Sequence, residues 1–335
     1  MTLTPIELLR QNALATRPVI SLSEGSDPRI VAGALAAHHA DLADVILVGP
    51  QTEVEAALKD QGAAPSQGVV VHDPATSELT EEFAQTYFGL RQHKGVDLAK
   101  ARATVKTAPV YAAMLVRSGR ATGTVGGAVH TTGDIVRAAI QVIGMAPDAG
   151  MVSSFFLMYP PENAQHGARA MLYSDCGLVI NPTADELSKI AIASAASART
   201  LLRVDPKIAM LSFSTKGSAK HQDVDKVIEA TETLRQIAPD LEVDGELQFD
   251  AAFVPSVGDR KSPGSSVAGQ ANVMIFPNLD AGNISYKITQ RLGGYAAIGP
   301  VLQGLAQPAN DLSRGCSAED VTQMIAVTAL QAIGT

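Results

Sequence analysis

Short apolar runs alternate with longer helical patterns along this chain, and that alternation constrains the fold more than any other feature of the sequence. In the first part of the chain, the runs with the length and composition of buried strands are residues 19–23, 44–48, 68–72 and 122–126. The segments with helical patterns between them are residues 29–40, 51–61, 78–92 and 106–118. This alternation predicts an α/β fold built on a largely parallel, doubly wound sheet.

The same pattern starts again near residue 150. The strand candidates there are residues 151–158, 169–174, 177–180, 207–213 and 272–276. Only two residues separate the runs 169–174 and 177–180, which predicts a hairpin and therefore an antiparallel pair in this second sheet. A helix is predicted over residues 183–203, because Thr183 and Glu186 have the spacing of a capping box at its start.

The length of the chain indicates more than one domain. At 335 residues it exceeds the size at which a single hydrophobic core usually stops growing. Residues 146–150 (APDAG) have the composition of a linker, and the last predicted helix, 318–333, follows a long Gly-rich region from which it can return to the first domain. We therefore expect a discontinuous first domain of residues 1–149 with about 305–335, and a second domain of residues 150–304.

Composition excludes several classes of protein. The net charge of −8 offers no basic face for nucleic acid, so we expect no nucleic-acid partner. Two cysteines, 140 positions apart, form neither a disulfide framework nor a metal-ligand cluster. No stretch has the length of a membrane span, and the N-terminus lacks the apolar core of a signal peptide. We expect a soluble cytoplasmic protein that does not bind membranes.

Gly and Ser concentrate in four segments, each of which follows a predicted strand or lies between two of them. These segments are residues 122–134, 212–220, 255–272 and 292–317. Ligands of open α/β sheets bind at the carboxyl ends of strands, and loops of this composition present backbone N–H groups to phosphate. Tight turns explain any one such loop equally well. Four of them favour an anion site, although both the dinucleotide fingerprint and the P-loop are missing.

Three arginines are candidates for binding a phosphoryl group. Arg91, Arg137 and Arg314 supply guanidinium groups, which hold phosphate in a bidentate manner. A surface ion pair is the alternative for each of them, and it is weakest for Arg314 in its loop of turn residues. Asp320 has two interpretations that do not exclude each other. It pairs with Ser317 as a capping box at the start of the last helix, or it acts as a general base.

Neither histidine nor cysteine indicates a metal site or a nucleophile. The histidines are scattered without metal-ligand spacing, so we expect no metal. His130 adjoins Thr131 and Thr132 in a Gly-rich loop, where a hydrogen bond to the local backbone is the simplest role. Cys316 has no histidine nearby to activate it, which favours a small buried residue over a nucleophile.

Seven long stretches of the chain, several of them irregular loops, have the character of family motifs: SEGSDPR (23–29), LRQHKG (90–95), HTTGDIVR (130–137), MLSFSTKGSA (210–219), DGELQFDAA (244–252), SPGSSVAGQANVMIFPNLDAGNISYKITQRLGG (262–294) and IGPVLQGLAQPANDLSRGCSAED (298–320). In these stretches, which span nearly its whole length, the chain resembles the phosphate acetyl/butyryl transferase family, and most closely its acetyl-transferring branch. The family usually has Pro-Glu-Gly where this chain has Ser23-Glu24-Gly25, a departure that touches no expected catalytic residue.

The resemblance implies two three-layer α/β/α domains with mostly parallel sheets, similar to the isocitrate and isopropylmalate dehydrogenases, with the active site in the cleft between them. It implies a homodimer that interconverts acetyl-CoA plus inorganic phosphate and acetyl phosphate plus CoA, with coenzyme A as a substrate and no cofactor. The catalytic residues that it implies are Ser313, Arg314 and Asp320. The residues expected to bind the phosphate or acyl group are Arg91, Arg137, Thr131 and Thr132.

Three other functions are compatible with parts of this pattern. One is transfer of a longer acyl group such as butyryl, which depends on a pocket size that the sequence does not reveal. Another is a non-catalytic module that senses acyl-CoA, which the intact Ser313, Arg314 and Asp320 disfavour. The third is a decarboxylating dehydrogenase, suggested by fold analogy alone and disfavoured because the sequence has no metal-binding carboxylate cluster.

Overall fold

The computed structural model describes residues 3–11, 17–164 and 168–334. Contacts between residues divide the chain into two compact units. The first unit consists of Pro5–Pro147 and Leu305–Thr335, and the second of Met1–Thr4 and Asp148–Gly304. The domain bounds expected from the sequence stay a prediction. None of the helices in the described ranges combines the length and the apolar character that a membrane span requires.

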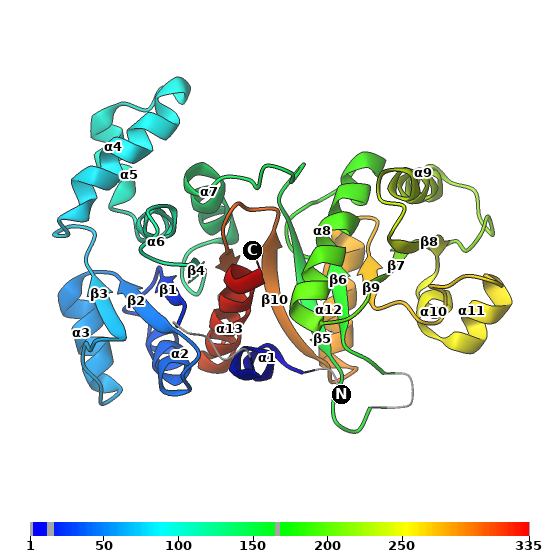
Figure 1. The fold of residues 1–335 in the computed structure, drawn as a ribbon, viewed down its shortest axis with the longest axis horizontal. Helices are drawn as coiled ribbons and strands as arrows, with labels where there is room; N and C mark the ends of the chain where they lie inside the picture. Colours follow the sequence, from blue (N-terminus) through cyan, green and yellow to red (C-terminus); the bar gives the residue numbers. More distant parts are fainter. Residues whose placement is uncertain (1–2, 12–16, 165–167, 335) are drawn as a thin grey trace. The chain divides into compact units, whose positions relative to one another are not determined.

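The first unit contains a five-stranded sheet in which every strand pair is parallel. Its strands, in spatial order, are β11 (Ala309–Asp311), β4 (Gly123–Gly126), β1 (Val19–Leu22), β2 (Asp44–Val48) and β3 (Val69–His72). The helices packed on one side are α2 (Pro28–His39), α3 (Gln51–Asp60) and α13 (Ala318–Gly334), and α1 (Pro5–Gln11) packs against α13. Those on the other side are α6 (Ala108–Arg117) and α7 (Thr132–Val142), with α4 (Leu79–Arg91), the short helix Gln92–Lys94 and α5 (Leu98–Val105) packed outside them (Figure 1).

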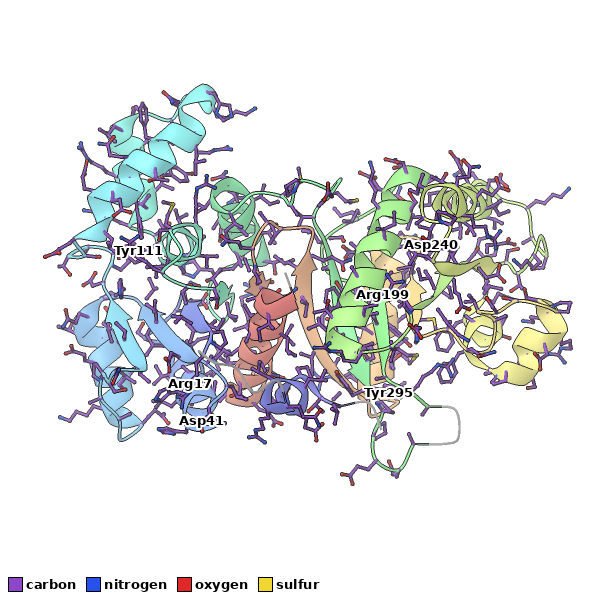
Figure 2. The ribbon with its side chains drawn as sticks, viewed as in Figure 1. Arg17, Asp41, Tyr111, Arg199, Asp240 and Tyr295 are labelled. Carbon is purple, nitrogen blue, oxygen red and sulfur yellow. The ribbon has the colours of Figure 1, made fainter. Side chains whose placement is uncertain are left out.

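Burial on both faces explains why the strands of the first unit have continuous apolar runs. Ile20, Leu22 and Leu47 are completely buried, as expected for a parallel sheet with helices on both sides. Tyr111 on α6 lies fully buried in the same core (Figure 2) and contacts the ring of Phe83 edge-on, at 5.1 Å between centroids. The scarce aromatic residues are thus used where helices pack against helices and sheet.

The second unit contains a six-stranded sheet that is mostly parallel. Its strands, in spatial order, are β10 (Ala296–Gln303), β5 (Ser153–Tyr159), β6 (Met171–Ser174), β9 (Val273–Ile275), β7 (Lys207–Leu211) and β8 (Glu242–Leu247). Its helices are α8 (Ala184–Leu202), α9 (Gln222–Ile237), α10 (Phe249–Phe253), α11 (Pro255–Lys261) and α12 (Leu279–Arg291). β5 is antiparallel to both of its neighbours, and the remaining pairs are parallel. The predicted α/β class with mostly parallel sheets is confirmed.

The predicted hairpin of residues 169–174 with 177–180 is wrong. The first run contains β6, but the second is not a strand. The Asp175 side chain accepts hydrogen bonds from the backbone N–H groups of Gly177 and Leu178, at 2.8 and 2.9 Å, and so bends the chain into a turn. The antiparallel partner of β6 is β5 instead. The prediction failed because an apolar run is not always a buried strand. Ile180, at the end of this run, is 75% exposed.

The capping box predicted at residue 183 is confirmed. The Thr183 hydroxyl accepts a hydrogen bond from the backbone N–H of Glu186 at 3.2 Å, and the Glu186 carboxylate accepts one from the backbone N–H of Thr183 at 2.8 Å. The sequence did not predict three of the described strands, β8, β10 and β11. β8 and β11 are rich in polar residues, and β10 is interrupted by Gly299 and Pro300, so none of the three presents an uninterrupted apolar run.

Candidate functional site

Three loops of the first unit meet at the carboxyl ends of adjacent strands. They are residues 23–27 after β1, residues 127–131 after β4 and residues 312–317 after β11. Backbone hydrogen bonds join them: Ser23 N–H donates to the Val125 carbonyl at 3.1 Å, and Leu312 N–H to the Gly126 carbonyl at 2.7 Å. The strand order β11-β4-β1 therefore brings together segments almost 300 positions apart, at the edge of the sheet where ligands of this fold bind.

A buried carboxylate holds the second of these loops. Glu24 is 6% exposed, and its two oxygens accept hydrogen bonds from the backbone N–H groups of four successive residues, 127–130, at 2.8 to 3.1 Å. The ring of His130 lies at 2.9 Å from the same carboxylate through Nδ1. His130 therefore pairs with a side chain, where the sequence led us to expect a partner on the local backbone.

Gly127 is needed where the second and third loops approach each other. Its φ of 106° lies in the left-handed region that other residues avoid. A Cβ at this position would lie 2.2 Å from Asp311 Oδ1 and 2.7 Å from the Leu312 carbonyl. The absence of a side chain thus allows direct contact between the two loops.

Thr131 and Thr132, two of the expected binding residues, begin α7 and already have partners. The Thr131 hydroxyl caps the helix by accepting a hydrogen bond from Asp134 N–H at 3.2 Å, and it donates to Asp134 Oδ2 at 2.7 Å. The Thr132 hydroxyl donates to Asp311 Oδ2 at 2.6 Å, across to the end of β11. Both threonines are exposed residues, although both hydroxyl groups are already hydrogen-bonded within the protein.

Asp311 is a buried acid with few partners. It is 1% exposed, and its Oδ1 has no hydrogen-bond partner among the described residues. Burial raises the pKa of Asp311 to about 7, with a smaller contribution from the negative charge of Glu24, against the hydrogen bond from Thr132. A carboxyl group that exchanges its proton near neutral pH therefore lies under the site.

The expected catalytic residues Ser313, Arg314 and Asp320 are exposed at the third loop and the start of α13. A bond from Cys316 N–H to the Ser313 carbonyl, at 2.9 Å, closes the loop. The Arg314 side chain has no hydrogen-bond partner among the described residues. Asp320 Oδ2 accepts hydrogen bonds from the backbone N–H and the hydroxyl of Ser317, at 2.8 and 2.9 Å, so the predicted capping box is confirmed.

The other two arginines are less closely connected to this group. Arg137 lies on α7, where Nη1 donates to Asp134 Oδ1 at 3.0 Å. Arg91 ends α4, and its buried Nε lacks a partner within the described chain. A hydrogen bond of 2.8 Å from Tyr87 Oη to Gln141 Oε1 ties α4 to α7. Across the described ranges, no hydrogen bond or ion pair joins Arg91 or Arg137 to Ser313, Arg314 or Asp320.

Sequence reasoning missed three charged residues that organise these loops: Glu24, Arg29 and Asp311. Two of them lie in SEGSDPR (23–29), directly after the first strand, and the third lies in the polar run that forms β11. Charged residues at the carboxyl end of a buried strand were the available signal. Cys316 is 7% exposed and burial raises its pKa, which agrees with the prediction of an unreactive thiol.

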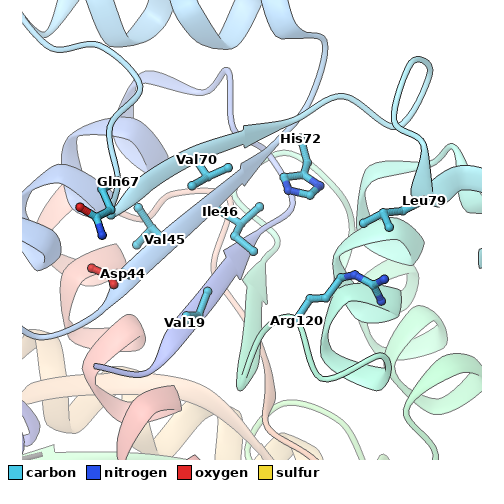
Figure 3. Close-up of a pocket in the computed structure, with 10 residues that line it drawn as sticks. Val19, Asp44, Val45, Ile46, Gln67, Val70, His72, Leu79 and Arg120 are labelled. Atoms are coloured by element: carbon cyan, nitrogen blue, oxygen red, sulfur yellow. The ribbon is translucent and has the colours of Figure 1, made fainter. Parts of the chain in front are cut away.

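One pocket of the first unit lies away from these loops. It has a volume of about 280 Å³, and the beginnings of β1, β2 and β3 supply much of its wall (Figure 3). Val19, Asp44, His72 and Arg120 are among its lining residues. None of its lining residues belongs to the three loops, so this pocket is separate from the candidate site. The described residues contain no group of three or more His, Cys, Asp or Glu placed to hold a metal ion.

Comparisons with known proteins agree on one family. The family model described as "Phosphate acetyl/butaryl transferase" matches residues 5–329. The chain is 46% identical to a phosphate acetyltransferase of Acetivibrio thermocellus, over 98% of each chain, and 45% identical to one of Paracoccus denitrificans, over 98% of this chain and 99% of that one. A crystal structure of a phosphotransacetylase from Streptococcus pyogenes superposes with a TM-score of 0.91 at 43% identity, covering 99% of this chain and 98% of that chain. The chain therefore belongs to the phosphate acetyl/butyryl transferase family.

Proposed function

We propose that this chain catalyses the reversible transfer of an acetyl group between coenzyme A and inorganic phosphate. Its substrates are acetyl-CoA and phosphate in one direction, and acetyl phosphate and CoA in the other. The observation that carries the proposal is that α7 and α13 both begin at the strand-end loops, one of which exposes Arg314 with no hydrogen-bond partner for its side chain among the described residues. Helix N-termini and guanidinium groups both attract phosphate.

In the direction of acetyl-CoA synthesis, the CoA thiol gives its proton to Asp320. The sulfur then attacks the acetyl carbonyl carbon, so that the C–S bond forms as the bond to the phosphate oxygen breaks. Because an ordinary thiol with a pKa of about 8.5 is mostly protonated at neutral pH, a base accelerates this step. Ser313 donates a hydrogen bond to the sulfur or to the developing oxyanion, and Arg314 stabilises the negative charge of the transition state. Phosphate is the leaving group.

The remaining residues bind and orient the reactants. Arg91 and Arg137 hold the phosphate and acyl groups, and Thr131 and Thr132 present the N-terminus of α7 to the phosphate. The exposure of Arg137 and of both threonines supports this assignment. Asp320 keeps its role as a cap at the same time, since only one of its oxygens accepts the hydrogen bonds of Ser317.

A thiol-release assay tests the proposed reaction directly. Acetyl-CoA is incubated with the protein and inorganic phosphate, and free CoA is measured with a chromogenic thiol reagent. We expect release that requires phosphate and produces an equal amount of acetyl phosphate. Release without phosphate would indicate a hydrolase, and no release would indicate a non-catalytic acyl-CoA sensor. The same assay with butyryl-CoA measures the acyl preference, and a higher kcat/KM for butyryl-CoA would replace acetyl by butyryl as the substrate.

Replacement of Asp320 by Asn separates the base from the cap. Asn can still accept the hydrogen bond of the Ser317 N–H but cannot take a proton, so kcat should fall by on the order of 10²-fold with Kd for CoA nearly unchanged. Thermal unfolding of the variant should stay close to that of the wild type. If Asp320→Asn retains wild-type turnover, Asp320 is a cap and the base lies elsewhere.

We also propose that the chain forms a homodimer. The apolar residues Ile284 and Ile288 on α12 and Leu292, the residue that follows its last turn, recur every four positions and are 56%, 52% and 85% exposed. This spacing places them on one face of the helix, and exposed apolar stripes of this kind mark protein interfaces. Light scattering coupled to size-exclusion chromatography should give twice the mass of one chain for the wild type. The double variant Ile284→Glu with Ile288→Glu should give the mass of a single chain. A double variant that stays dimeric would move the interface elsewhere.

A further inference from the structure

Arg29, the second residue of α2, has hydrogen-bonding partners in three separate segments. A guanidinium group carries five N–H bonds in a planar fork. Nε and Nη2 donate to the two carboxylate oxygens of Asp27, at 3.0 and 2.8 Å. Nη2 also donates to the carbonyl of Ala128 at 2.8 Å, and Nη1 to those of Arg314 and Cys316 at 2.7 and 3.4 Å. All five N–H groups are therefore used inside the protein.

Asp27 fixes the orientation of this fork. The Asp27 carboxylate caps α2 by accepting a hydrogen bond from Arg29 N–H at 2.9 Å, and it holds the guanidinium in a bidentate pair at the same time. The hydrogen bond from the Arg29 side chain is the largest influence on Asp27, and it lowers the pKa of that carboxyl group. The charge of Arg29 is thus compensated by a neighbour that belongs to the same helix start.

The carbonyl groups that Arg29 binds belong to the two loops of the candidate site. Ala128 lies in the loop whose N–H groups are held by Glu24, directly before Thr131 and Thr132. The Arg314 carbonyl belongs to the residue whose side chain we assign to the transition state. Because a bound carbonyl fixes the plane of its peptide, Arg29 restricts the direction in which the Arg314 side chain leaves the backbone.

We propose that Arg29 is a positioning residue, which sets the third loop against the second and so places Ser313 and Arg314 for acyl transfer without touching the substrate. The inference rests on the proposed function for its kinetic consequence. A direct contact with the anion would require Arg29 to give up at least one of its five hydrogen bonds. Lysine cannot replace it, because one ammonium group does not reach a carboxylate and three carbonyls in a plane.

The test compares Arg29→Lys and Arg29→Gln with a matched control, Arg102→Gln. Arg102 also forms a bidentate pair with a carboxylate, Glu81, at 2.8 and 2.7 Å, but it lies on α5 and contacts none of the three loops. Both Arg29 variants should lose on the order of 10- to 100-fold in kcat, since small misplacements of catalytic groups have effects of this size. KM for phosphate should change by no more than about threefold, because the binding groups themselves remain. Arg102→Gln should leave both constants unchanged.

Hydrogen exchange provides a readout that does not depend on activity. Amides of residues 312–317 should exchange about tenfold faster in Arg29→Gln than in the wild type, while those in the middle of α13 keep their protection. This measurement remains informative even if the wild type shows no phosphate-dependent release of CoA. That result would refute the proposed function but not the positioning role of Arg29. If Arg29→Gln fails to fold, the Lys variant carries both measurements.

Three outcomes would overturn the inference. Unchanged kcat in a folded Arg29 variant would show that the third loop keeps its catalytic position without the Arg29 guanidinium. A large rise in KM for phosphate with kcat unchanged would show that Arg29 binds the anion directly. Faster exchange throughout the first unit would show that Arg29 contributes only to general stability.

Discussion

Gly- and Ser-rich loops follow parallel strands in both units, and the charges near them are compensated to different extents. In the second unit, Lys216 pairs with Asp244, which is also bound by Arg235 at 2.9 Å, and Lys261 pairs with Asp250 at 2.8 Å. The corresponding loops of the first unit leave the Arg314 guanidinium without a partner among the described residues.

The buried carboxylates of the two units differ in the same way. Asp175 of the second unit accepts hydrogen bonds from Gly177 N–H and Leu178 N–H and from both the backbone N–H and the hydroxyl of Ser154. Asp311 of the first unit accepts a hydrogen bond from the Thr132 hydroxyl, its Oδ1 lacks a hydrogen-bond partner among the described residues, and burial raises its pKa to about 7. Loop composition therefore does not distinguish the two units, whereas the compensation of charge does, and it is the less compensated loops of the first unit that we propose as the site.

Removal of the Arg314 guanidinium, which pairs with no described residue, should have the largest effect. Arg314→Ala is expected to lower kcat by on the order of 10²-fold or more, because a preset positive group stabilises transition-state charge. Steady-state kinetics in both directions measure the loss, and thermal unfolding should be unaffected since no described residue pairs with this side chain. A purified variant with near wild-type turnover would remove Arg314 from the mechanism.

Asp311→Asn and Asp175→Asn should change stability in opposite directions at pH 8. The pKa of Asp311 is raised from 3.8 to about 7, so the folded state binds this proton more tightly than the unfolded state. The protonated Asp311 therefore contributes fully to the stability of the folded state below about pH 4, and this contribution is lost as the pH rises to about 7. Between pH 5 and pH 7 the loss is about 2 kcal/mol, because the slope of 1.36 kcal/mol per pH unit decreases as the group ionises in the folded state near pH 7. Asp311→Asn should abolish that loss.

Asp175→Asn should instead destabilise the protein by about 1–3 kcal/mol at every pH, since an amide cannot accept all the hydrogen bonds that the carboxylate accepts. Urea unfolding at pH 5 and pH 8 measures both variants. If Asp311→Asn shows the same pH dependence as the wild type, the buried acid is ionised throughout and the contrast between the two units disappears.

Lys216→Ala should have a moderate effect on stability and little on turnover. The substitution removes one of the cations beside Asp244, a carboxylate that is 5% exposed, but leaves Arg235 in place. We expect a loss of about 1–3 kcal/mol in the free energy of unfolding, with kcat per folded molecule changed by less than about threefold. A loss of kcat as large as that of Arg314→Ala would show that the second unit also contributes a catalytic cation.

The smallest effect concerns the two thiols, one in each unit. Burial raises the pKa of Cys316, and burial raises that of Cys176 well above its usual value, with a further contribution from the charge of Asp175. Both should react with iodoacetamide at pH 8 more slowly than a free cysteine. Cys316, at 7% exposure, should react before the completely buried Cys176. Mass spectrometry of samples taken during the reaction shows which cysteine is alkylated first. Alkylation of Cys176 before Cys316 would contradict the burial of the two side chains.

The sequence alone determined the elements whose signals are local. Apolar runs located β1, β2 and β7 to within two residues, and capping boxes located the starts of α8 and α13. The same signals failed at residues 177–180, where a side chain bends the chain into a turn, and at β11, whose residues are polar although buried. A local sequence pattern predicts the conformation that neighbouring residues adopt together. It contains no information about burial by elements that are distant in the chain.

Only the tertiary structure decided which loops meet. The order β11-β4-β1 places the start of the chain's second helix beside a loop almost 300 residues later, and it thereby joins Arg29 to the Arg314 carbonyl and Thr132 to Asp311. Strand order depends on pairing between segments far apart in the chain, which no window of sequence contains. The residue types needed for anion chemistry are visible in the sequence, whereas their orientation comes from buried partners that the fold supplies.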